Sequence, residues 1–293
     1  MAARYEILSL AGEDLSGKSS KELSELYNEL LNDGMHGLCF SPYEEGQAPG
    51  DQLSVEQIKR RIEIIKPHTQ WVRSFSCTEG NEMIPKIAKE NGLKTLVGAW
   101  LGTDDEINQK EIEGVIEVAK AGHADIVAVG NEVLYRKDLT EDELLAFIYQ
   151  VKDAIPDIPV SYVDAYYEFG FKPRITEACD VILANCYPYW EGCALEYSLL
   201  YMKDMFRRAM MAADGKRVII TETGWPDQGQ VFHGAVPSHE NAMKYFINTQ
   251  LWSKQEDIEI FYFSSFDESW KTGDEGDVGA YWGIWDKDEK SKF

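Results

Sequence analysis

The clearest indication of the fold lies in residues 94–163, which read KTLVGAWLGTDDEINQKEIEGVIEVAKAGHADIVAVGNEVLYRKDLTEDELLAFIYQVKDAIPDIPVSYV. Three short apolar runs stand in this stretch, at Lys94–Ala99, Ile126–Val129 and Val160–Val163. Each run is nearly continuous, as expected of a strand that is buried on both faces of a parallel sheet. Between the runs, apolar residues recur every three or four positions from Ile112 to Ala119 and from Leu144 to Val151, which predicts amphipathic helices.

The same alternation continues in both directions along the chain. Helical periodicity lies between several further runs, and Ser54-x-x-Gln57 and Thr140-x-x-Glu143 are capping boxes that mark helix starts. Successive strands are separated by about 22 to 42 residues, which is the size of a βα unit. Eight such units predict an α/β fold, a (β/α)₈ TIM barrel, and a doubly wound open sheet is the competing fold. The five further strands are predicted at Gly37–Phe40, Trp71–Phe75, Val181–Ala184, Val218–Thr221 and Glu259–Phe263.

Residues 1–34 precede the first predicted strand and are interpreted as an N-terminal extension. We expect one extra helix in it, with an apolar stripe from Leu23 to Leu31 that packs on a barrel domain of residues 35–293. Met1–Leu10 lacks the apolar region of a signal peptide. The sequence contains no run of about 18 apolar residues, so no membrane-spanning helix is predicted. A cytoplasmic location is expected if the chain is complete, and an extracytoplasmic one if it is a trimmed mature form.

The charge of the chain restricts its partners. The sequence has 29 Lys and Arg residues against 51 Asp and Glu residues, a formal net charge of −22 at pH 7. Such a chain repels phosphate backbones and anionic membranes, so we expect a neutral partner and no nucleic acid or membrane. The histidines form no ligand pair, and the five cysteines include no Cys-x-x-Cys, so no metal is expected. Dinucleotide and P-loop motifs are absent too, and no cofactor is expected; the oligomeric state is not indicated.

Two glutamates follow apolar runs whose ends the barrel would bring to the same face. Asn131-Glu132 comes after the fourth predicted strand and Glu222 after the seventh. Active sites of (β/α)₈ barrels lie at the C-terminal ends of the strands, so both carboxylates would face one cleft. A lone glutamate there would be interpreted as an exposed loop residue or an ion-pair partner. Two of them are the minimum for glycoside hydrolysis, in which one carboxyl group donates a proton while the other attacks or activates water.

The other strand ends supply polar and aromatic side chains that suit a sugar. Sugar rings stack their C–H faces on aromatic rings, while their hydroxyl groups need polar partners. Six of the eight tryptophans follow strand ends or lie in the last segment, and about half of these six are expected in the core. The residues expected to bind substrate are Asn131, Arg73, Tyr43, Tyr187, Trp190, Trp225, Glu268 and Lys271.

The strand-end motifs resemble those of glycoside hydrolase family 17, the β-1,3-glucanase family within a large clan of retaining (β/α)₈ enzymes, with the bacterial branch as the closer match. Asn131-Glu132 resembles the pair that carries the acid/base in that clan. The sequence Thr221-Glu222-Thr223-Gly224-Trp225-Pro226 resembles the nucleophile signature of the family. Tyr187-Pro188-Tyr189 and Phe266-Asp267-Glu268 with Lys271 resemble its strand-six and strand-eight segments.

The resemblance runs from about Leu38 to Asp286 and includes two departures. The family often carries Asn-Tyr before the step that reads Ser41-Pro42-Tyr43 here, and Ser269 stands where bacterial relatives often have proline. Neither departure touches the two glutamates, but both bear on the sugar subsites, and hence on linkage and chain-length preference.

The resemblance implies a retaining hydrolase that cleaves β-1,3-glucan or its oligosaccharides by double displacement. Glu222 would attack the anomeric carbon, and Glu132 would protonate the leaving oxygen and then deprotonate the incoming water. The other implied roles are a bond from Asn131 to the sugar 2-OH, orientation of Glu222 by Tyr187, support of the nucleophile by Arg73, and hydroxyl binding or tuning of Glu132 by Glu268 and Lys271.

Two other functions are compatible with the sequence. A β-1,3-glucan transglycosylase would use the same site with a sugar hydroxyl in place of water, and acceptor-side aromatics such as Trp190 and Trp225 would favour it. A non-catalytic glucan-binding barrel would be expected to lack at least one glutamate, yet both are present. The exact linkage and the choice between endo and exo attack depend on loop shapes that the sequence does not specify.

Overall fold

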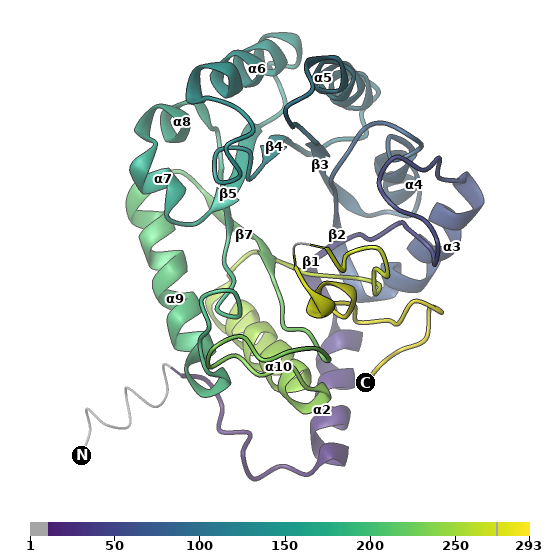
Figure 1. Ribbon diagram of the computed structural model, residues 1–293, viewed down its shortest axis with the longest axis vertical. Helices are drawn as coiled ribbons and strands as arrows, with labels where there is room; N and C mark the ends of the chain where they lie inside the picture. The colour runs from purple at the N-terminus through teal and green to yellow at the C-terminus, as the bar shows by residue number, and fades with distance from the viewer. Residues whose placement is uncertain (1–10, 274) are drawn as a thin grey trace.

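Eight parallel strands close into a barrel in the computed structural model, which describes residues 11–273 and 275–293 (Figure 1). The strands are β1 (Met35–Cys39), β2 (Thr69–Ser74), β3 (Lys94–Ala99), β4 (Ile126–Asn131), β5 (Val160–Ala165), β6 (Ile182–Asn185), β7 (Val218–Thr223) and β8 (Ile260–Tyr262). Each pairs with the next along the chain, and β8 closes on β1 where Gly37 lies beside Phe261. Glycine permits this closure, because a Cβ atom at position 37 would lie 2.5 Å from the Phe261 ring. The closed order confirms the TIM barrel and excludes the doubly wound open sheet.

Helices follow the strands and surround the barrel (Figure 1). Both predicted capping boxes are formed: Ser54 and Gln57 begin α3, and Thr140 and Glu143 begin α6. The α-helices are α2 (Ser20–Asp33), α3 (Val55–Ile65), α4 (Met83–Glu90), α5 (Asp105–Lys120), α6 (Glu141–Ala154), α7 (Glu168–Phe171), α8 (Pro173–Ala178), α9 (Leu195–Ala212) and α10 (His239–Glu256), with 3₁₀ turns at Lys66–His68 and Asp277–Ala280.

The helix predicted before the first strand is α2. Ser19 and Glu22 form a capping box at its start, and its apolar face is buried. α2 lies beside α10, with the rings of Tyr27 and Phe246 at a centroid distance of 4.3 Å (Figure 1). Residues 1–10 of the predicted extension lie outside the described residues, and the division at residue 34 stays a prediction.

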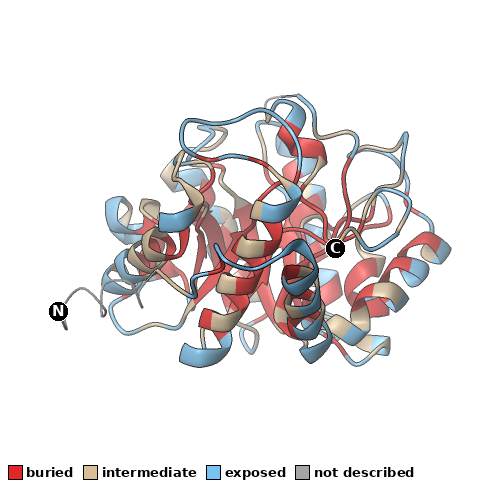
Figure 2. Ribbon diagram, turned by 90° about the horizontal axis from the view of Figure 1, so that it is seen from below, coloured by how far each residue is buried: buried red, intermediate tan, exposed pale blue. Residues whose placement is uncertain are grey.

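Buried residues concentrate in the strands and in the helix faces that cover them (Figure 2). The predicted strands agree with the observed ones to within two residues at either end. β4 and β7 each run two residues further than their apolar runs, so Asn131 and Glu222 belong to the strands themselves. In the described part of the chain, no helix has the length and apolarity needed to cross a membrane.

Candidate active site

The strand ends that carry the two predicted glutamates are irregular. The pairing of β4 with β5 shifts register between Ala128 and Asn131, and that of β7 with β8 shifts between Ile220 and Thr223. Such irregularities turn a side chain out of its regular alternation and are common beside active sites. Glu132 follows directly, with a φ of 52° that non-glycine residues rarely adopt. Backbone strain of this kind concentrates at functional positions.

The side-chain amide of Asn185 lies between the two glutamates. Its Nδ2 atom is 2.8 Å from Oε1 of Glu132 and 3.2 Å from Oε1 of Glu222. Because 2.8 and 3.2 Å are two sides of one triangle, the two carboxylate oxygens lie no more than about 6 Å apart. Thr221 donates a hydrogen bond of 2.9 Å to Oδ1 of Asn185, which holds the amide in this orientation. Retaining glycosidases separate their carboxyl groups by about 5–5.5 Å and inverting ones by about 6.5–9.5 Å.

Each oxygen of Glu222 has its own charged or phenolic donor. Nη1 of Arg73 lies 2.5 Å from Oε1, and the Tyr187 hydroxyl donates to Oε2 at 2.8 Å. Burial, followed by the nearby Glu222 carboxylate, raises the pKa of Tyr187 well above its ordinary value, so the phenol stays a neutral donor. Charge-assisted hydrogen bonds of this type stabilise a carboxylate and fix its orientation.

The Arg73 guanidinium connects the two strand ends. It is buried, and besides Glu222 it donates to Oδ1 of Asn131 at 2.7 Å and to the Thr221 carbonyl oxygen at 3.0 Å. Its planar face lies 4.3 Å from the centre of the Phe75 ring. Burial is the largest single influence and would lower the pKa of Arg73, but the charge and hydrogen bond of Glu222, together with Cys39 and Tyr187, raise the pKa above its ordinary value. Arg73 therefore remains a cation beneath the site.

The Glu132 carboxyl group holds its proton more tightly than an ordinary glutamate does. Burial is the main cause that raises its pKa above the ordinary value, and the Glu222 carboxylate adds to it. The Asn185 hydrogen bond and the cations Arg136 and Arg73 oppose the rise without cancelling it. A carboxyl group whose pKa is raised in this way can remain protonated closer to neutral pH, as a general acid must.

Arg136 fixes the loop that follows Glu132. Its guanidinium donates to the carbonyl oxygens of Asn131 at 2.6 Å and Leu101 at 3.2 Å, and to Asp138 at 2.7 Å. It also lies 4.9 Å from the centre of the Trp100 ring, which is 41% exposed. One side chain thus joins the ends of β3 and β4 to the loop beyond them.

The predicted residues after β1 and β8 gather on one side of the site. The Tyr43 ring, which is half-buried, meets the Trp270 ring edge-on at a centroid distance of 5.9 Å. Nε1 of Trp270 donates to Glu268 at 3.2 Å. Burial would lower the pKa of Lys271, but nearby carboxylates, Glu268 first and Glu222 among them, outweigh it and raise the pKa. Lys271 thus lies within reach of the charges of Glu268 and Glu222, whereas the charges that weigh most on Glu132 are those of Glu222 and two arginines.

The two tryptophans predicted to bind sugar differ in accessibility. Trp190 is half-buried and leans on Trp282 at a centroid distance of 5.6 Å. Trp225 is only 2% exposed, packs against Tyr189 and Tyr245, and its Nε1 donates to a backbone carbonyl oxygen. A ring enclosed in this way offers no face to a sugar. The predicted substrate contact of Trp225 is therefore corrected to a packing role.

Two residues at the centre of the site were not among the predicted site residues. Asn185 is the last residue of β6, and its position one place beyond an apolar run was the signal available. Arg136 lies four residues beyond Glu132, where one turn of chain can bring a side chain back to the strand end.

Among the described residues, no group of three or more His, Cys, Asp or Glu side chains is placed to hold a metal ion.

A buried pair on β5, Tyr162 and Asp164, supports the chain just after Glu132. The Tyr162 hydroxyl donates to Asp164 and accepts the backbone N–H of Leu134 at 3.0 Å, two residues beyond Glu132. The second Asp164 oxygen accepts the Ala165 N–H at 2.7 Å. Burial raises the pKa of Asp164 from 3.8 to about 7.

This pair contributes stability that is lost as the pH rises. Between pH 4 and about 7 the folded chain keeps the Asp164 proton that the unfolded chain has already released, so folding becomes less favourable toward pH 7. Asp164 alone should lower the free energy of unfolding by about 3–4 kcal/mol over this range, and Asp164→Asn should remove that contribution from the profile. His36, whose pKa burial lowers to about 4, acts in the opposite direction in both proteins, so the prediction is read from the difference between the two profiles. Urea unfolding at a series of pH values measures it.

The control for this prediction is Asp153→Asn, an exposed aspartate near the end of α6. It should leave the pH profile of the unfolding free energy as in the wild type. Part of the slope should survive in Asp164→Asn, because burial also raises the pKa of Asp267, to about 6. An Asp164→Asn profile parallel to the wild-type one would contradict the prediction.

A parallel eight-stranded barrel with two bridged glutamates at the ends of its fourth and seventh strands defines the class of (β/α)₈ glycoside hydrolases. The family model described as the BtgE/BtgC glycoside hydrolase domain matches residues 37–283. The chain belongs to this family, within glycoside hydrolase family 17, and is a glycoside hydrolase.

Named relatives agree with this assignment. A glucan 1,3-β-glucosidase of Arthroderma benhamiae is 31% identical over 83% of this chain and 84% of its own length. A glucan 1,3-β-glucosidase of Candida albicans is 27% identical over 83% of this chain and 87% of its own length. The crystal structure of a glycoside hydrolase family 17 β-1,3-glucanosyltransferase from Rhizomucor miehei superposes with a TM-score of 0.80 at 28% identity, covering 89% of this chain and 96% of that one.

Proposed function

We propose that the protein hydrolyses β-1,3-glucan or its oligosaccharides with retention of anomeric configuration. The observation that carries the proposal is the bridge from Asn185 to both glutamates, because it holds the two carboxyl groups close enough for a covalent intermediate. The linkage is supported by the names of the relatives, which are glucan 1,3-β-glucosidases and a β-1,3-glucanosyltransferase.

The two glutamates divide the chemistry between them. Glu222 attacks the anomeric carbon, the glycosidic bond breaks, and the leaving oxygen takes the proton of Glu132. Glu132, now ionised, removes a proton from water, which attacks the glycosyl ester and releases Glu222. The donors Arg73 and Tyr187 orient the two oxygens of Glu222, while burial suits Glu132 to carry the proton.

Asn131 is proposed to bind a hydroxyl group of the sugar ring. Its Oδ1 atom accepts a hydrogen bond of 2.7 Å from Arg73, which leaves its Nδ2 donor available for a sugar hydroxyl. A hydrogen bond to the 2-OH of the sugar at the cleavage point strengthens in the transition state. Tyr43, Trp190, Glu268 and Lys271 are proposed to complete the binding surface, from the loops after β1, β6 and β8.

The test is a product time course on linear β-1,3-glucan and defined β-1,3-oligosaccharides, with the anomeric configuration followed by NMR. We expect shorter products that first appear as β-anomers. Initial α-anomers would exclude the retaining mechanism, and no turnover on β-1,3 linkages would exclude the proposed substrate. Products longer than the starting oligosaccharide would instead show transfer to a sugar acceptor, the activity named for the Rhizomucor miehei relative.

A further inference from the structure

The buried carboxyl group of Glu111, on α5, takes no part in the proposed mechanism. Its Oε1 atom accepts from the hydroxyl groups of Ser76 at 2.5 Å and Thr78 at 2.7 Å. Its Oε2 atom accepts from the backbone N–H groups of Cys77 at 2.8 Å and Trp100 at 3.0 Å. Burial raises the pKa of Glu111 above its ordinary value, and these four hydrogen bonds oppose the rise. Because all four donors are uncharged and burying a carboxylate is costly, what these bonds hold together needs an explanation.

Helix α5 lies close against the two segments that Glu111 binds. Asn108, Glu111 and Gly114 follow each other at intervals of three residues, so they share one face of the helix. The Asn108 side chain accepts from the N–H of Gly102 and donates to its carbonyl oxygen, both at 2.8 Å. A Cβ atom at Gly114 would lie 2.6 Å from the Cys77 carbonyl oxygen, so only glycine permits this approach. This face of α5 therefore holds the chain just after β2 and just after β3.

The two segments that Glu111 joins each carry an aromatic ring that lies against an arginine of the site. The Phe75 ring lies 4.3 Å from the Arg73 guanidinium, and the Trp100 ring lies 4.9 Å from the Arg136 guanidinium. The first arginine donates to the proposed nucleophile, and the second donates to the carbonyl oxygen directly before the proposed general acid. A ring that is fixed at its backbone restricts the cation that lies on its face.

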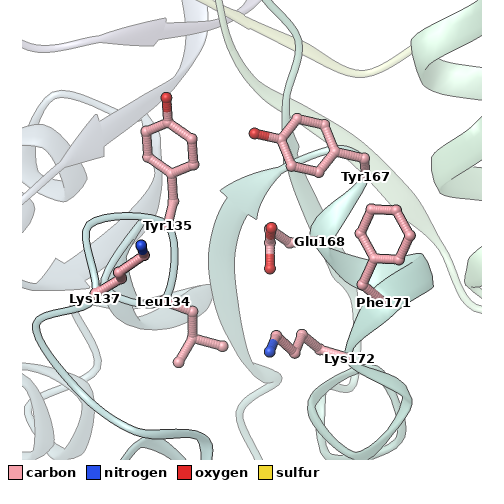
Figure 3. A pocket seen from close by; sticks show the side chains of 7 residues that line it. All are labelled: Leu134, Tyr135, Lys137, Tyr167, Glu168, Phe171 and Lys172. Atoms are coloured by element: carbon pink, nitrogen blue, oxygen red, sulfur yellow. The ribbon is translucent and has the colours of Figure 1, made fainter.

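The loop that carries Arg136 depends on its β3 side for support. On its β5 side the loop borders a pocket of about 670 Å³, and Figure 3 shows Tyr135 and Tyr167 on opposite sides of the opening. On its β3 side, Arg136 donates to the Leu101 carbonyl oxygen at 3.2 Å and lies against Trp100. An open pocket cannot hold the loop in place, so its position rests on the β3 side and on the buried pair on β5.

We propose that Glu111 is a positioning residue for the reaction. It fixes the chain after β2 and β3, and through the rings of Phe75 and Trp100 it holds Arg73 and Arg136 beside the two catalytic glutamates. This inference rests on the proposed function. The essential task of the carboxylate is to accept two backbone N–H groups with one oxygen atom, and its charge is secondary. Loss of those bonds frees the arginines to move, and a displacement of about 1 Å in a site can cost about 100-fold in rate.

The test compares two substitutions of nearly equal size. Glu111→Met leaves the N–H groups of Cys77 and Trp100 without an acceptor, so kcat on β-1,3-oligosaccharides should fall about 10–100-fold. KM should change by less than about threefold, because the proposed binding surface lies on the loops after β1, β6 and β8. Glu111→Gln should keep about half of the wild-type kcat or more, since its oxygen can still accept both N–H groups while the two hydroxyl groups turn to accept from its amide. Circular dichroism gives the folded fraction to which each rate is referred.

Arg136→Met tests the route by which Glu111 acts. It should lower kcat in the wild type but cost much less in the Glu111→Met background, because both changes break the same connection. Losses that multiply would overturn the inference, and so would an Arg136→Met variant with wild-type kcat. Wild-type kcat in Glu111→Met would also overturn it. Equal losses in Glu111→Gln and Glu111→Met would assign the effect to charge and contradict a positioning role.

The matched control is Glu117→Met, at an exposed position on the same helix, which should leave kcat and KM unchanged. If Glu111→Met does not fold, Trp100→Ala tests the same connection, because it removes the ring against Arg136 and leaves the buried carboxylate in place. Its kcat should fall about 3–10-fold, and an unchanged kcat would overturn the inference. No turnover by the wild type would instead refute the proposed function.

Discussion

Replacing Glu222 with glutamine is expected to lower kcat on β-1,3-oligosaccharides on the order of 10⁴-fold or more. The amide keeps the shape of the side chain, although its single oxygen can accept from only one of Arg73 and Tyr187, which lie at 2.5 and 2.8 Å from the two carboxylate oxygens. It lacks the negative charge and the nucleophilic oxygen that form the glycosyl ester. Rates of reducing-sugar release measure the loss, and thermal unfolding checks that the variant is folded.

The stereochemistry of a rescued variant makes this assignment sharper. Glu222→Ala leaves space on the nucleophile side, where azide can attack the anomeric carbon of an activated aryl β-glucoside directly. A single displacement inverts the centre, so the product should be an α-glycosyl azide. Glu117→Gln, at an exposed position on α5, should behave as the wild type. A Glu222→Gln variant that retains a tenth of the wild-type rate would remove Glu222 from the role of nucleophile.

The sequence predicts the barrel well because burial on both faces leaves a strong mark. A strand at the centre of a (β/α)₈ barrel must be apolar along nearly its whole length, so each apolar run locates one. An apolar run cannot show that a strand continues into polar residues. The ends of β4 and β7 were therefore predicted two residues too early. α9 (Leu195–Ala212) was not located by a named pattern, although its Met202 and Met205 are buried.

The site is less predictable, since register and packing decide what the strand ends present. Asn185 pairs in register with Glu222 only because the β6–β7 ladder shifts by one residue after Ala184. Nothing in the apolar run signals that shift. Three of the six strand-end tryptophans, Trp225, Trp282 and Trp285, are buried, which agrees with the expectation that about half are core. Which three are buried depends on neighbours that lie far away in the chain.

Glu132→Ala is expected to separate the two steps of the reaction. On oligosaccharides, whose leaving oxygen needs a proton, kcat/KM should fall about 10²–10⁴-fold. On an aryl glucoside with a good leaving group the first step needs little acid help, so the glycosyl-enzyme should accumulate and give a burst of phenol. Azide needs no general base and should restore turnover, and it attacks the α-linked ester from the opposite face to give a β-glycosyl azide. That product is the opposite anomer of the glycosyl azide expected from Glu222→Ala.

The pH profile tests the same residue independently. In the wild type, kcat/KM on oligosaccharides should fall as the pH rises through the pKa of Glu132, because the general acid must be protonated and burial places that pKa above its ordinary value. Glu132→Ala on the aryl substrate should lose this alkaline limb. If the limb persists, another group sets it, and Glu132 is then not the acid. Asp138→Asn is the matched control: it removes a carboxylate six residues away that contacts Arg136, and the alkaline limb should remain.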